Sequence, residues 1–498
     1  MAYVLLFSIF VIATCGLIYE LIAGTLASYL LGDSITQFST VIGAFLFSMG
    51  VGSYLSKFVT KNLIALFIKV ELLVGLFGGF SAAILFVSFE FVSYFRVLLY
   101  GIVFIIGVLV GFEIPILMRI LQTKFDFREL VSKVFTFDYI GALFASILFP
   151  LLLVPHLGLI KTAFLFGIFN IIVGIWALYI FRNDIKLFKL YTKISCMILI
   201  ILLLGFIFSE NILNISESKS YPDSIIYSKT TNYQRIVLTK SMKDYRLFLN
   251  KNLQFSSKDE YRYHESLVHI GLSSLHNPKS VLVLGGGDGL AIREILKYPT
   301  VTEIVLVELD SEMTKIFSKN KVLTNLNKNS LLSYKVKIIN EDAFLWLKHN
   351  TKRFDFIVVD FPDPSNFSVG KLYTNSFYRL LKTAIAENGV GVIQSTSPYV
   401  AKKTFWCVNN TLKSVGFKTL PYHVYVPAFG DWGYFLIYNN NFYLTNNFPS
   451  DLKYINADVA KSLFVFSNDL LSDNKEINKL NNQILVKYFE EEWSEYVP

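Results

Sequence analysis

The fold of the second half of this chain is decided by one stretch, Val281-Leu282-Val283-Leu284-Gly285-Gly286-Gly287-Asp288-Gly289. Its four apolar residues predict a buried strand, and the glycines permit a tight turn into a helix over 290–297. A second strand is expected over 303–307, and Glu308 at its end lies 20 positions after Asp288. A glycine turn followed at this spacing by an acid is typical of folds that bind ribose, whereas a turn without a ligand is the structural alternative.

The alternation of strand and helix continues after this unit. Further strands are expected over 335–339, 355–359 and 390–394, and the first two end near Asp342 and Asp360. Ligands of such sheets bind at the carboxyl ends of the strands. We therefore expect a nucleoside-binding, Rossmann-like α/β domain of the methyltransferase type. A small N-terminal β-sheet over 224–250 and a helix over 259–275 are expected to precede it.

The first half of the chain has a different composition. Of 498 residues 53% are hydrophobic, and the apolar residues concentrate before Ser209 in long runs without charge. A membrane-spanning helix needs about 20 such residues. We therefore expect an α-helical transmembrane bundle of about seven helices in the lipid bilayer, near residues 4–30, 35–55, 64–88, 97–118, 138–155, 160–181 and 193–208.

These patterns give four expected regions: 1–208 transmembrane, 221–280 small sheet plus helix, 281–445 catalytic α/β domain, and 446–498 a partly helical tail, with a helix over 476–493. The net charge is +8, and many of the basic residues lie in short loops between apolar runs, which argues against nucleic acid as a partner. The three cysteines form no pair with metal-ligand spacing, so no metal site is expected.

Taken together and in order, the soluble motifs resemble the spermidine synthases, which are polyamine aminopropyltransferases, and the apolar half resembles their multi-span, membrane-anchored bacterial branch. The resemblance covers about residues 225–440. It is carried by Asn232-Tyr233-Gln234, 259–265, the glycine turn, Val307-Glu308-Leu309-Asp310, Asp342-Ala343 and Asp360-Phe361-Pro362-Asp363-Pro364.

The resemblance implies transfer of an aminopropyl group from decarboxylated S-adenosylmethionine to a diamine, with putrescine the expected acceptor. The donor is a co-substrate, and no cofactor is implied. Asp360 would be the catalytic base. The polyamine would be bound by His264, Asp288 and Asp363, and the nucleoside by Gln234, Gly285, Gly287, Glu308, Asp342 and Ala343. The expected partners are these small molecules and the lipid bilayer, and a homo-oligomer is left open.

The charge of Asp288 gives a physical reason for this donor. A carboxylate at that position repels the carboxylate of ordinary S-adenosylmethionine and attracts the ammonium of the decarboxylated form. Two alternatives remain: a methyltransferase of the same fold, which leaves Asp360 and Asp363 without a purpose, and a polyamine transporter or sensor that uses such a domain for binding.

The sequence gives conflicting indications of orientation. Basic residues follow the second, fourth and sixth spans, so the positive-inside rule with seven crossings places the catalytic domain outside the cell membrane. Its expected nucleoside substrate is cytoplasmic, and on that ground we favour a cytoplasmic domain. Acids in or near the spans suggest binding of a cationic polyamine, with helix capping or ion pairing as the alternative: Glu20, Glu71, Glu113 and Asp138.

Overall fold

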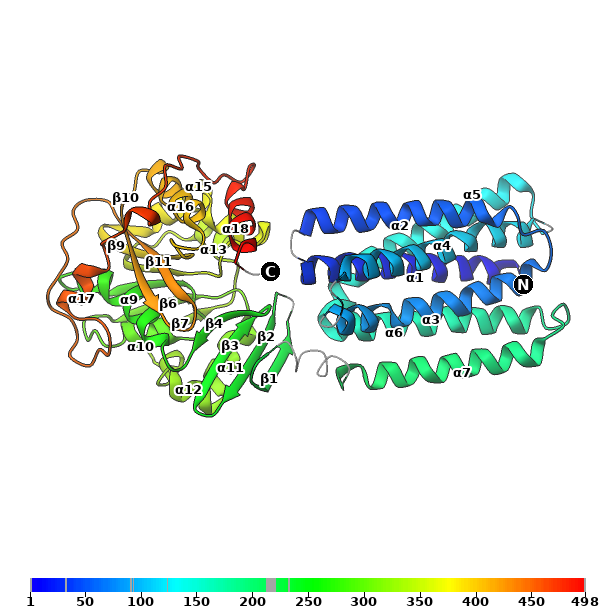
Figure 1. Ribbon diagram of the computed structural model, residues 1–498, viewed down its shortest axis with the longest axis horizontal. Helices are drawn as coiled ribbons and strands as arrows, with labels where there is room; N and C mark the ends of the chain where they lie inside the picture. Colours follow the sequence, from blue (N-terminus) through cyan, green and yellow to red (C-terminus); the bar gives the residue numbers. More distant parts are fainter. Residues whose placement is uncertain are drawn as a thin grey trace. The chain divides into compact units, whose positions relative to one another are not determined.

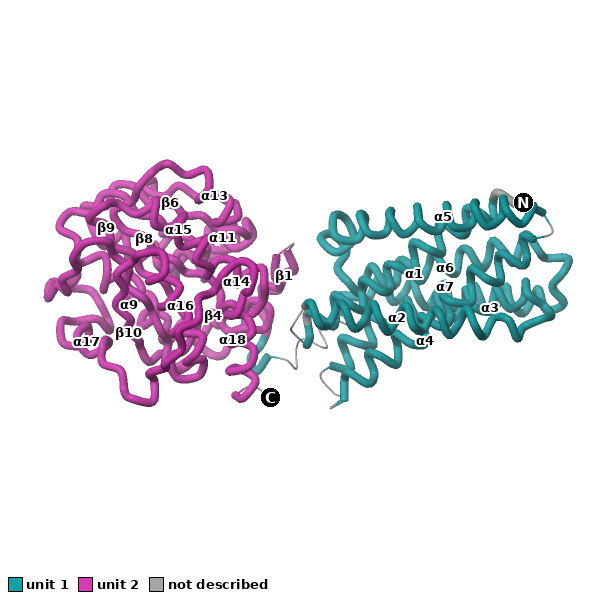
Figure 2. The backbone as a smooth tube through the Cα atoms, turned by 90° about the horizontal axis from the view of Figure 1, so that it is seen from above, with its two compact units in different colours: residues 1–224 teal, residues 225–498 magenta. Residues whose placement is uncertain are grey.

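The computed structural model describes residues 2–31, 34–89, 92, 94–122, 124–211, 221–231 and 233–496. The chain divides into two compact units, Met1–Ser224 and Ile225–Pro498 (Figure 2). The first unit is helical and the second contains the sheets (Figure 1). The small sheet and the α/β domain lie in the same unit. The finer division into four regions that the sequence suggests stays a prediction.

Unit 1 is a bundle of long helices in which α1 packs against α2, α3, α4, α5 and α6. Glycines let some of these helices approach closely. A Cβ on Gly52 of α2 would lie 2.0 Å from the carbonyl oxygen of Val108 in α4. The helices are α1 (Ala2–Leu31), α2 (Ser34–Ser56), α3 (Leu63–Phe89), α4 (Phe95–Leu121), α5 (Phe127–Leu148), η1 (Phe149–Leu153), α6 (Val154–Ile180) and α7 (Phe188–Ile207).

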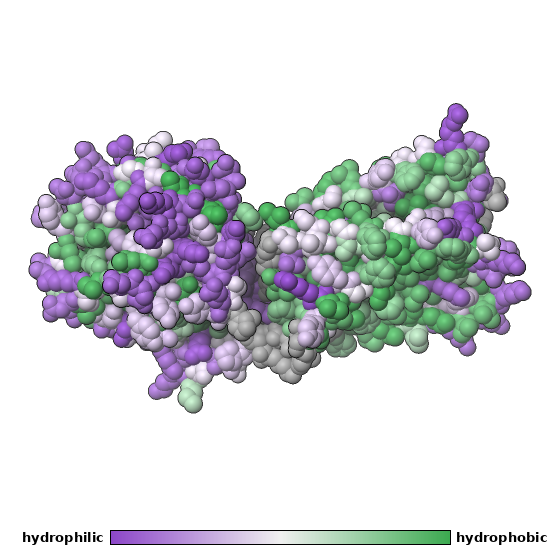
Figure 3. Space-filling model, turned by 45° about the horizontal axis from the view of Figure 1, so that its top comes forward, coloured by the Kyte–Doolittle hydropathy of each residue, from purple (hydrophilic) through white to green (hydrophobic). Residues whose placement is uncertain are grey.

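Six helical segments in the described part of unit 1 are long and apolar enough to cross a membrane. The sequence predicts seven spans, and the difference lies in Phe127–Ile180, a segment of 54 residues that joins the fifth and sixth predicted spans. A π-helical turn at Phe149–Leu153 and a left-handed Gly158 (φ 73°) interrupt it. Both α5 and α6 pack on α1. Hydrophobic side chains dominate the visible face of this unit (Figure 3).

Unit 2 begins with a four-stranded antiparallel sheet in the order β1-β2-β3-β4. The sequence predicts three of these strands and misses β4. The hairpin turn before β4 is Asn250-Lys251, with φ of 50° and 70°. Hairpin turns with two positive φ angles usually contain a glycine, by which they are recognised in a sequence, and this turn has none. The strands are β1 (Ser224–Thr230), β2 (Arg235–Ser241), β3 (Asp244–Leu249) and β4 (Asn252–Ser256).

A seven-stranded sheet in the order β10-β11-β9-β8-β5-β6-β7 forms the centre of unit 2. The strands β5 to β9 run parallel to one another, and β11 runs antiparallel to both of its neighbours, β9 and β10. The expected α/β fold is therefore present. The strands are β5 (Ser280–Gly285), β6 (Glu303–Val307), β7 (Val336–Ile339), β8 (Phe354–Asp360), β9 (Ile385–Ser395), β10 (Lys418–Val426) and β11 (Gly430–Tyr438).

Helices cover both faces of this sheet. In β5, Val281 and Val283 face one hydrophobic core, and Leu282 and Leu284 face the other, as the two-residue period of a strand requires. The first core is closed by α9 (Glu260–Leu272), α10 (Leu290–Ile295), α11 (Ser311–Lys319) and α12 (Lys321–Leu326). The second is closed by α13 (Ala343–His349), α15 (Asn375–Ala384) and α16 (Lys402–Ser414).

The C-terminal tail is mostly irregular. It contains α17 (Ala457–Ser462), η4 (Asn468–Leu470) and α18 (Ile484–Ser494). The helix predicted over 476–493 is wrong before Ile484. Gln483 has a left-handed φ of 39°, and the side chain of Asn478 donates to the carbonyl of Gly370 (3.2 Å) instead of facing solvent on a helix.

Candidate active site

The glycine turn after β5 is shaped by two acids from neighbouring strands. Gly285 ends β5 with φ 79°, and a Cβ there would lie 2.2 Å from the carbonyl oxygen of Asp360, its register partner on β8. A Cβ on Gly287 would lie 2.7 Å from Cγ of Glu308. The absence of a side chain thus makes room for the backbone of Asp360 at Gly285 and for the side chain of Glu308 at Gly287. That either glycine contacts a nucleoside stays a prediction.

Asp360 is the last residue of β8, at the carboxyl end of the sheet. The hydroxyl of Tyr263 in α9 donates to its Oδ1 at 2.5 Å. Burial, together with the charge of Asp288, raises the pKa of Asp360 to about 6, against the opposing effects of His264 and Tyr263. At neutral pH the carboxylate is ionised and able to accept a proton, as a general base requires.

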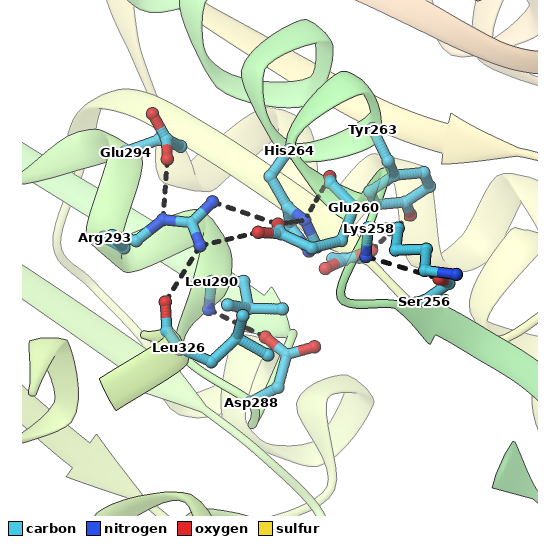
Figure 4. A network of polar contacts seen from close by, with 12 residues as sticks. Ser256, Lys258, Glu260, Tyr263, His264, Asp288, Leu290, Arg293, Glu294 and Leu326 are labelled. Atoms are coloured by element: carbon cyan, nitrogen blue, oxygen red, sulfur yellow. Dashed lines mark hydrogen bonds and ion pairs between the residues drawn. The ribbon is translucent and has the colours of Figure 1, made fainter. Parts of the chain in front are cut away.

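His264 is held in a charged network at the amino end of α9 (Figure 4). Its Nδ1 lies 2.8 Å from Oε2 of Glu260, and the guanidinium of Arg293 donates to both oxygens of Glu260 at 2.8 and 3.0 Å. Burial opposes the charge, but the hydrogen bond and charge of Glu260 raise the pKa of His264 to about 9. Both nitrogens of an imidazolium are donors, so His264 stabilises nearby carboxylates. The predicted contact of His264 with the polyamine stays a prediction.

Breaking this network should destabilise unit 2. Arg293→Met leaves Glu260 buried without its bidentate partner, and loss of one member of a buried pair costs about 3–5 kcal/mol. We expect a clear fall in the melting temperature of the detergent-solubilised full chain. Lys352→Met is the matched control, since its ion pair with Glu303 is exposed and worth less than about 1 kcal/mol. Equal melting temperatures for both variants would contradict the assignment.

Asp288 lies between the glycine turn and α10. Its Oδ1 accepts a hydrogen bond from the backbone N–H of Leu290 at 2.8 Å, which fixes the direction of the carboxylate. Burial raises its pKa, and the charge of His264 opposes that shift. His264, Asp288 and Asp360 affect one another's ionisation, so the structure brings these three predicted residues together.

Glu308 follows β6 and turns back to the glycine turn. Its carboxylate accepts from the N–H of Gly287 (3.1 Å) and of Asp310 (2.9 Å). Burial raises its pKa to about 7, against those two hydrogen bonds. Gln234 reaches the same place from the small sheet, because its amide donates to Oδ2 of Asp310 at 3.0 Å. The structure therefore brings Gln234 and Glu308 to one edge.

Asp342 and Ala343 lie further along that edge, after β7. Asp342 caps α13 by accepting from the N–H of Phe344 at 2.8 Å, and Ala343 is its first residue. The other oxygen of Asp342 forms an ion pair with Lys371 at 2.6 Å. Lys371 follows the short helix α14 (Phe367–Gly370), in the segment after Asp363. A nucleoside contact by Asp342 stays a prediction, because protein groups already occupy both oxygens.

Asp363 lies in the segment that leaves β8. Its Oδ1 is buried and has no hydrogen-bond partner in the described part of the chain. Burial raises its pKa to about 7, although Thr396 and Gln394 oppose that shift. Gln394 also donates to the carbonyl of Phe361 and accepts from the indole of Trp432 at 3.0 Å, so it ties β9 and β11 to this segment.

Sequence reasoning missed three residues that hold the predicted ones. Tyr263 bonds to Asp360, Asp310 bonds to Gln234, and Glu260 bonds to His264. All three lie inside segments that resemble the family, next to or near a predicted residue. Their positions within these segments were a sequence signal that could have identified them, but only the fold shows which side chains meet. Asn232 lies outside the described residues.

The parallel sheet, the glycine turn and the acids at the strand ends define a Rossmann-like enzyme domain that binds a nucleoside substrate. A family model described as the spermine/spermidine synthase domain matches residues 260–447. A polyamine aminopropyltransferase of Leptospira interrogans is 51% identical, and polyamine aminopropyltransferase 2 of Ralstonia nicotianae is 49% identical. Each match covers 98% of both chains. The chain belongs to the polyamine aminopropyltransferase family.

Among solved structures, the spermidine synthase from Thermotoga maritima is similar at 26% identity, with a TM-score of 0.46. The match covers 49% of this chain and 85% of that one. Family membership at this identity over the full length makes the chain an enzyme that transfers aminopropyl groups. The donor is consumed as a co-substrate, and no other cofactor is needed. The methyltransferase alternative is thereby set aside.

Proposed function

We propose that the enzyme transfers the aminopropyl group of decarboxylated S-adenosylmethionine to putrescine, giving spermidine and methylthioadenosine. The observation that carries this proposal is the pair Asp360 and Asp363, two partly buried carboxylates, one at the end of β8 and the other three positions further on. One carboxylate serves as base, and the other presents an unpartnered oxygen suited to a second ammonium group. A diamine supplies both partners.

The reaction needs a proton acceptor and no redox change. The amine nitrogen attacks the methylene carbon next to the sulfonium, the C–S bond breaks, and its electron pair neutralises the sulfur. An alkyl amine has a pKa near 10.4, judged by lysine, so it arrives protonated. Asp360 holds this ammonium and takes one of its protons, which frees the nitrogen lone pair that forms the C–N bond, while Tyr263 keeps the carboxylate in position.

The nucleoside would lie along the ends of β5, β6 and β7. Glu308, directed at the glycine turn by two backbone N–H groups, is the ribose ligand in this proposal. Gln234 and Asp342 border the same side. Asp288 borders the aminopropyl end, and the cationic His264 acts there through the carboxylates of Asp288 and Asp360.

Glu308→Gln should weaken donor binding before it affects chemistry. A hydrogen bond to a charged group contributes about 1.5–3 kcal/mol, so the Kd of decarboxylated donor should rise about tenfold to a hundredfold. The rate at saturating donor should change little. Isothermal titration and initial rates of methylthioadenosine release measure the two effects. Lost turnover with unchanged donor affinity would refute the ribose role. Glu303→Gln, an exposed acid at the other end of β6, is the control.

The acceptor is identified by comparing amines in one assay. Purified full-length protein with decarboxylated donor is offered putrescine, cadaverine, agmatine or spermidine, and kcat/KM is measured for each. We expect putrescine to give the highest value. Preference for a longer or guanidino-bearing amine would replace the acceptor while leaving the reaction class intact.

We also propose that unit 1 lies in the cell membrane as a multi-pass anchor. Six segments of sufficient length and hydropathy support this placement. A cytoplasmic catalytic unit is preferred because the nucleoside donor is made inside the cell, although the basic loops favour the opposite orientation with seven crossings. Homo-oligomerisation stays a prediction.

A further inference from the structure

Two glutamates inside the helical bundle have no role in the aminopropyl-transfer site. Glu71 of α3 is 0% exposed and Glu113 of α4 is 1% exposed. Both oxygens of Glu113 and Oε1 of Glu71 have no hydrogen-bond partner among the residues that the structure describes. Helices α3 and α4 pack against each other, and both pack against α1, which carries Tyr19. The two carboxyls are close enough for their charges to repel each other. They therefore belong to one buried cluster.

The position of Glu71 follows from close packing of α3 on α6. A Cβ on Gly75 would lie 2.9 Å from the carbonyl oxygen of Gly167, and a Cβ on Gly167 would lie 2.7 Å from that of Gly75. These backbones touch, so Asn170, three residues after Gly167, meets Glu71, four residues before Gly75. Gly174 leaves space beside the Cβ of Glu71.

A chain of hydrogen bonds directs the Asn170 amide at Glu71. The Tyr19 hydroxyl donates to Oδ1 of Asn170 at 2.9 Å, and Nδ2 of Asn170 donates to Oε2 of Glu71 at 3.0 Å. Since Tyr19 fixes the oxygen of the amide, its NH₂ group must face the carboxylate. One oxygen of Glu71 is thus satisfied by the protein, and three carboxylate oxygens of the cluster remain.

Three buried acceptor oxygens are costly unless a donor reaches them. An unpaired buried polar group costs several kcal/mol, and an acid inside a membrane bundle is a functional site by default. A primary ammonium group has three N–H donors and one positive charge. Among the described residues no group of three or more His, Cys, Asp or Glu is placed to hold a metal ion.

We propose that Glu71 and Glu113, with Tyr19 and Asn170, form a binding site for a primary alkylammonium group inside the helical unit. This inference rests on the proposed function for its ligand, since polyamines are the cationic amines that the catalytic unit handles. A polyamine end would pair with Glu113 and with Oε1 of Glu71, and the helical unit would thereby bind substrate or product in addition to anchoring the enzyme.

Binding stoichiometry tests this proposal on the full-length protein in lipid nanodiscs. Equilibrium dialysis with radiolabelled spermidine should show two sites per chain. Glu113→Gln, which is isosteric, should remove one site or raise its Kd at least tenfold, and Glu71→Gln should do the same. Asp363→Asn should weaken the other site. The control is Glu129→Gln, an exposed acid of the same unit paired with Lys133, which should keep both sites.

Turnover separates this inference from the proposed function. Glu113→Gln should release methylthioadenosine within about twofold of the wild-type rate, which also shows that the variant is folded. The inference would be overturned if the wild type bound spermidine at one site only, and if Asp363→Asn removed that site while Glu113→Gln kept it. Absence of turnover in the wild type, with a site that still depends on Glu113, would instead contradict the proposed function alone.

Discussion

Asp360→Asn is expected to lower kcat by about 10²–10⁴-fold, the usual contribution of a general base. The substitution keeps the shape of the side chain and its hydrogen bond with Tyr263, but an amide accepts no proton from the incoming ammonium. Donor binding should be largely retained, because the role proposed for Asp360 is to bind the acceptor amine. Single-turnover release of methylthioadenosine, with donor affinity measured separately, checks both statements.

The matched control is Asp355→Asn. Asp355 lies in the same strand but near its amino end, where it accepts from the backbone N–H groups of Lys279 and Ser280 at 2.8 and 2.9 Å. Its variant should turn over at close to the wild-type rate. Normal turnover by Asp360→Asn would refute the assigned base.

The pH profile of the wild type gives an independent test of the same residue. The raised pKa of Asp360 is about 6, so the carboxylate is ionised above that pH and protonated below it. A base must be ionised, hence kcat/KM should fall at least tenfold per pH unit as the pH drops below 6. In Asp360→Asn this limb should become shallower, but it should persist in part, because Asp363 and Glu308, whose pKa values burial raises to about 7, also become protonated.

Asp288→Asn is the second change with a large expected effect, and it acts on the choice of donor. In the proposed function the carboxylate attracts the ammonium of the aminopropyl chain, and a charged hydrogen bond contributes about 1.5–3 kcal/mol. The KM of decarboxylated donor should therefore rise about tenfold to a hundredfold. The same change removes repulsion of the carboxylate of S-adenosylmethionine, so that compound should become a stronger inhibitor.

Competition by S-adenosylmethionine measures this selectivity directly. The ratio of its inhibition constant to the KM of the decarboxylated donor should shrink by at least tenfold in Asp288→Asn. The backbone bond from Leu290 tolerates the substitution, since an amide oxygen still accepts it. An unchanged ratio would show that donor selection lies elsewhere.

The sheet could be predicted because its local signals are strong. Strands β5 and β6 combine continuous apolar runs with a glycine turn, and β6 is observed with the bounds expected, Glu303–Val307. Weaker signals led to errors. The hairpin turn Asn250-Lys251 lacks glycine, and residues 476–483, for which the sequence predicts a helix, fold as a loop tied to Gly370. Long-range contacts decide such segments.

The sequence by itself determined that the acids at the strand ends lie at one edge of the sheet. Parallel strands place their carboxyl ends at the same edge whatever the packing. The sequence also determined the apolar bundle, since hydropathy alone predicts such helices. Only the tertiary structure decided which side chains meet: Tyr263 with Asp360, Asp310 with Gln234, and Asn170 with Glu71. Such pairs lie 76 to 99 positions apart in the chain, and no local pattern encodes contacts at that separation.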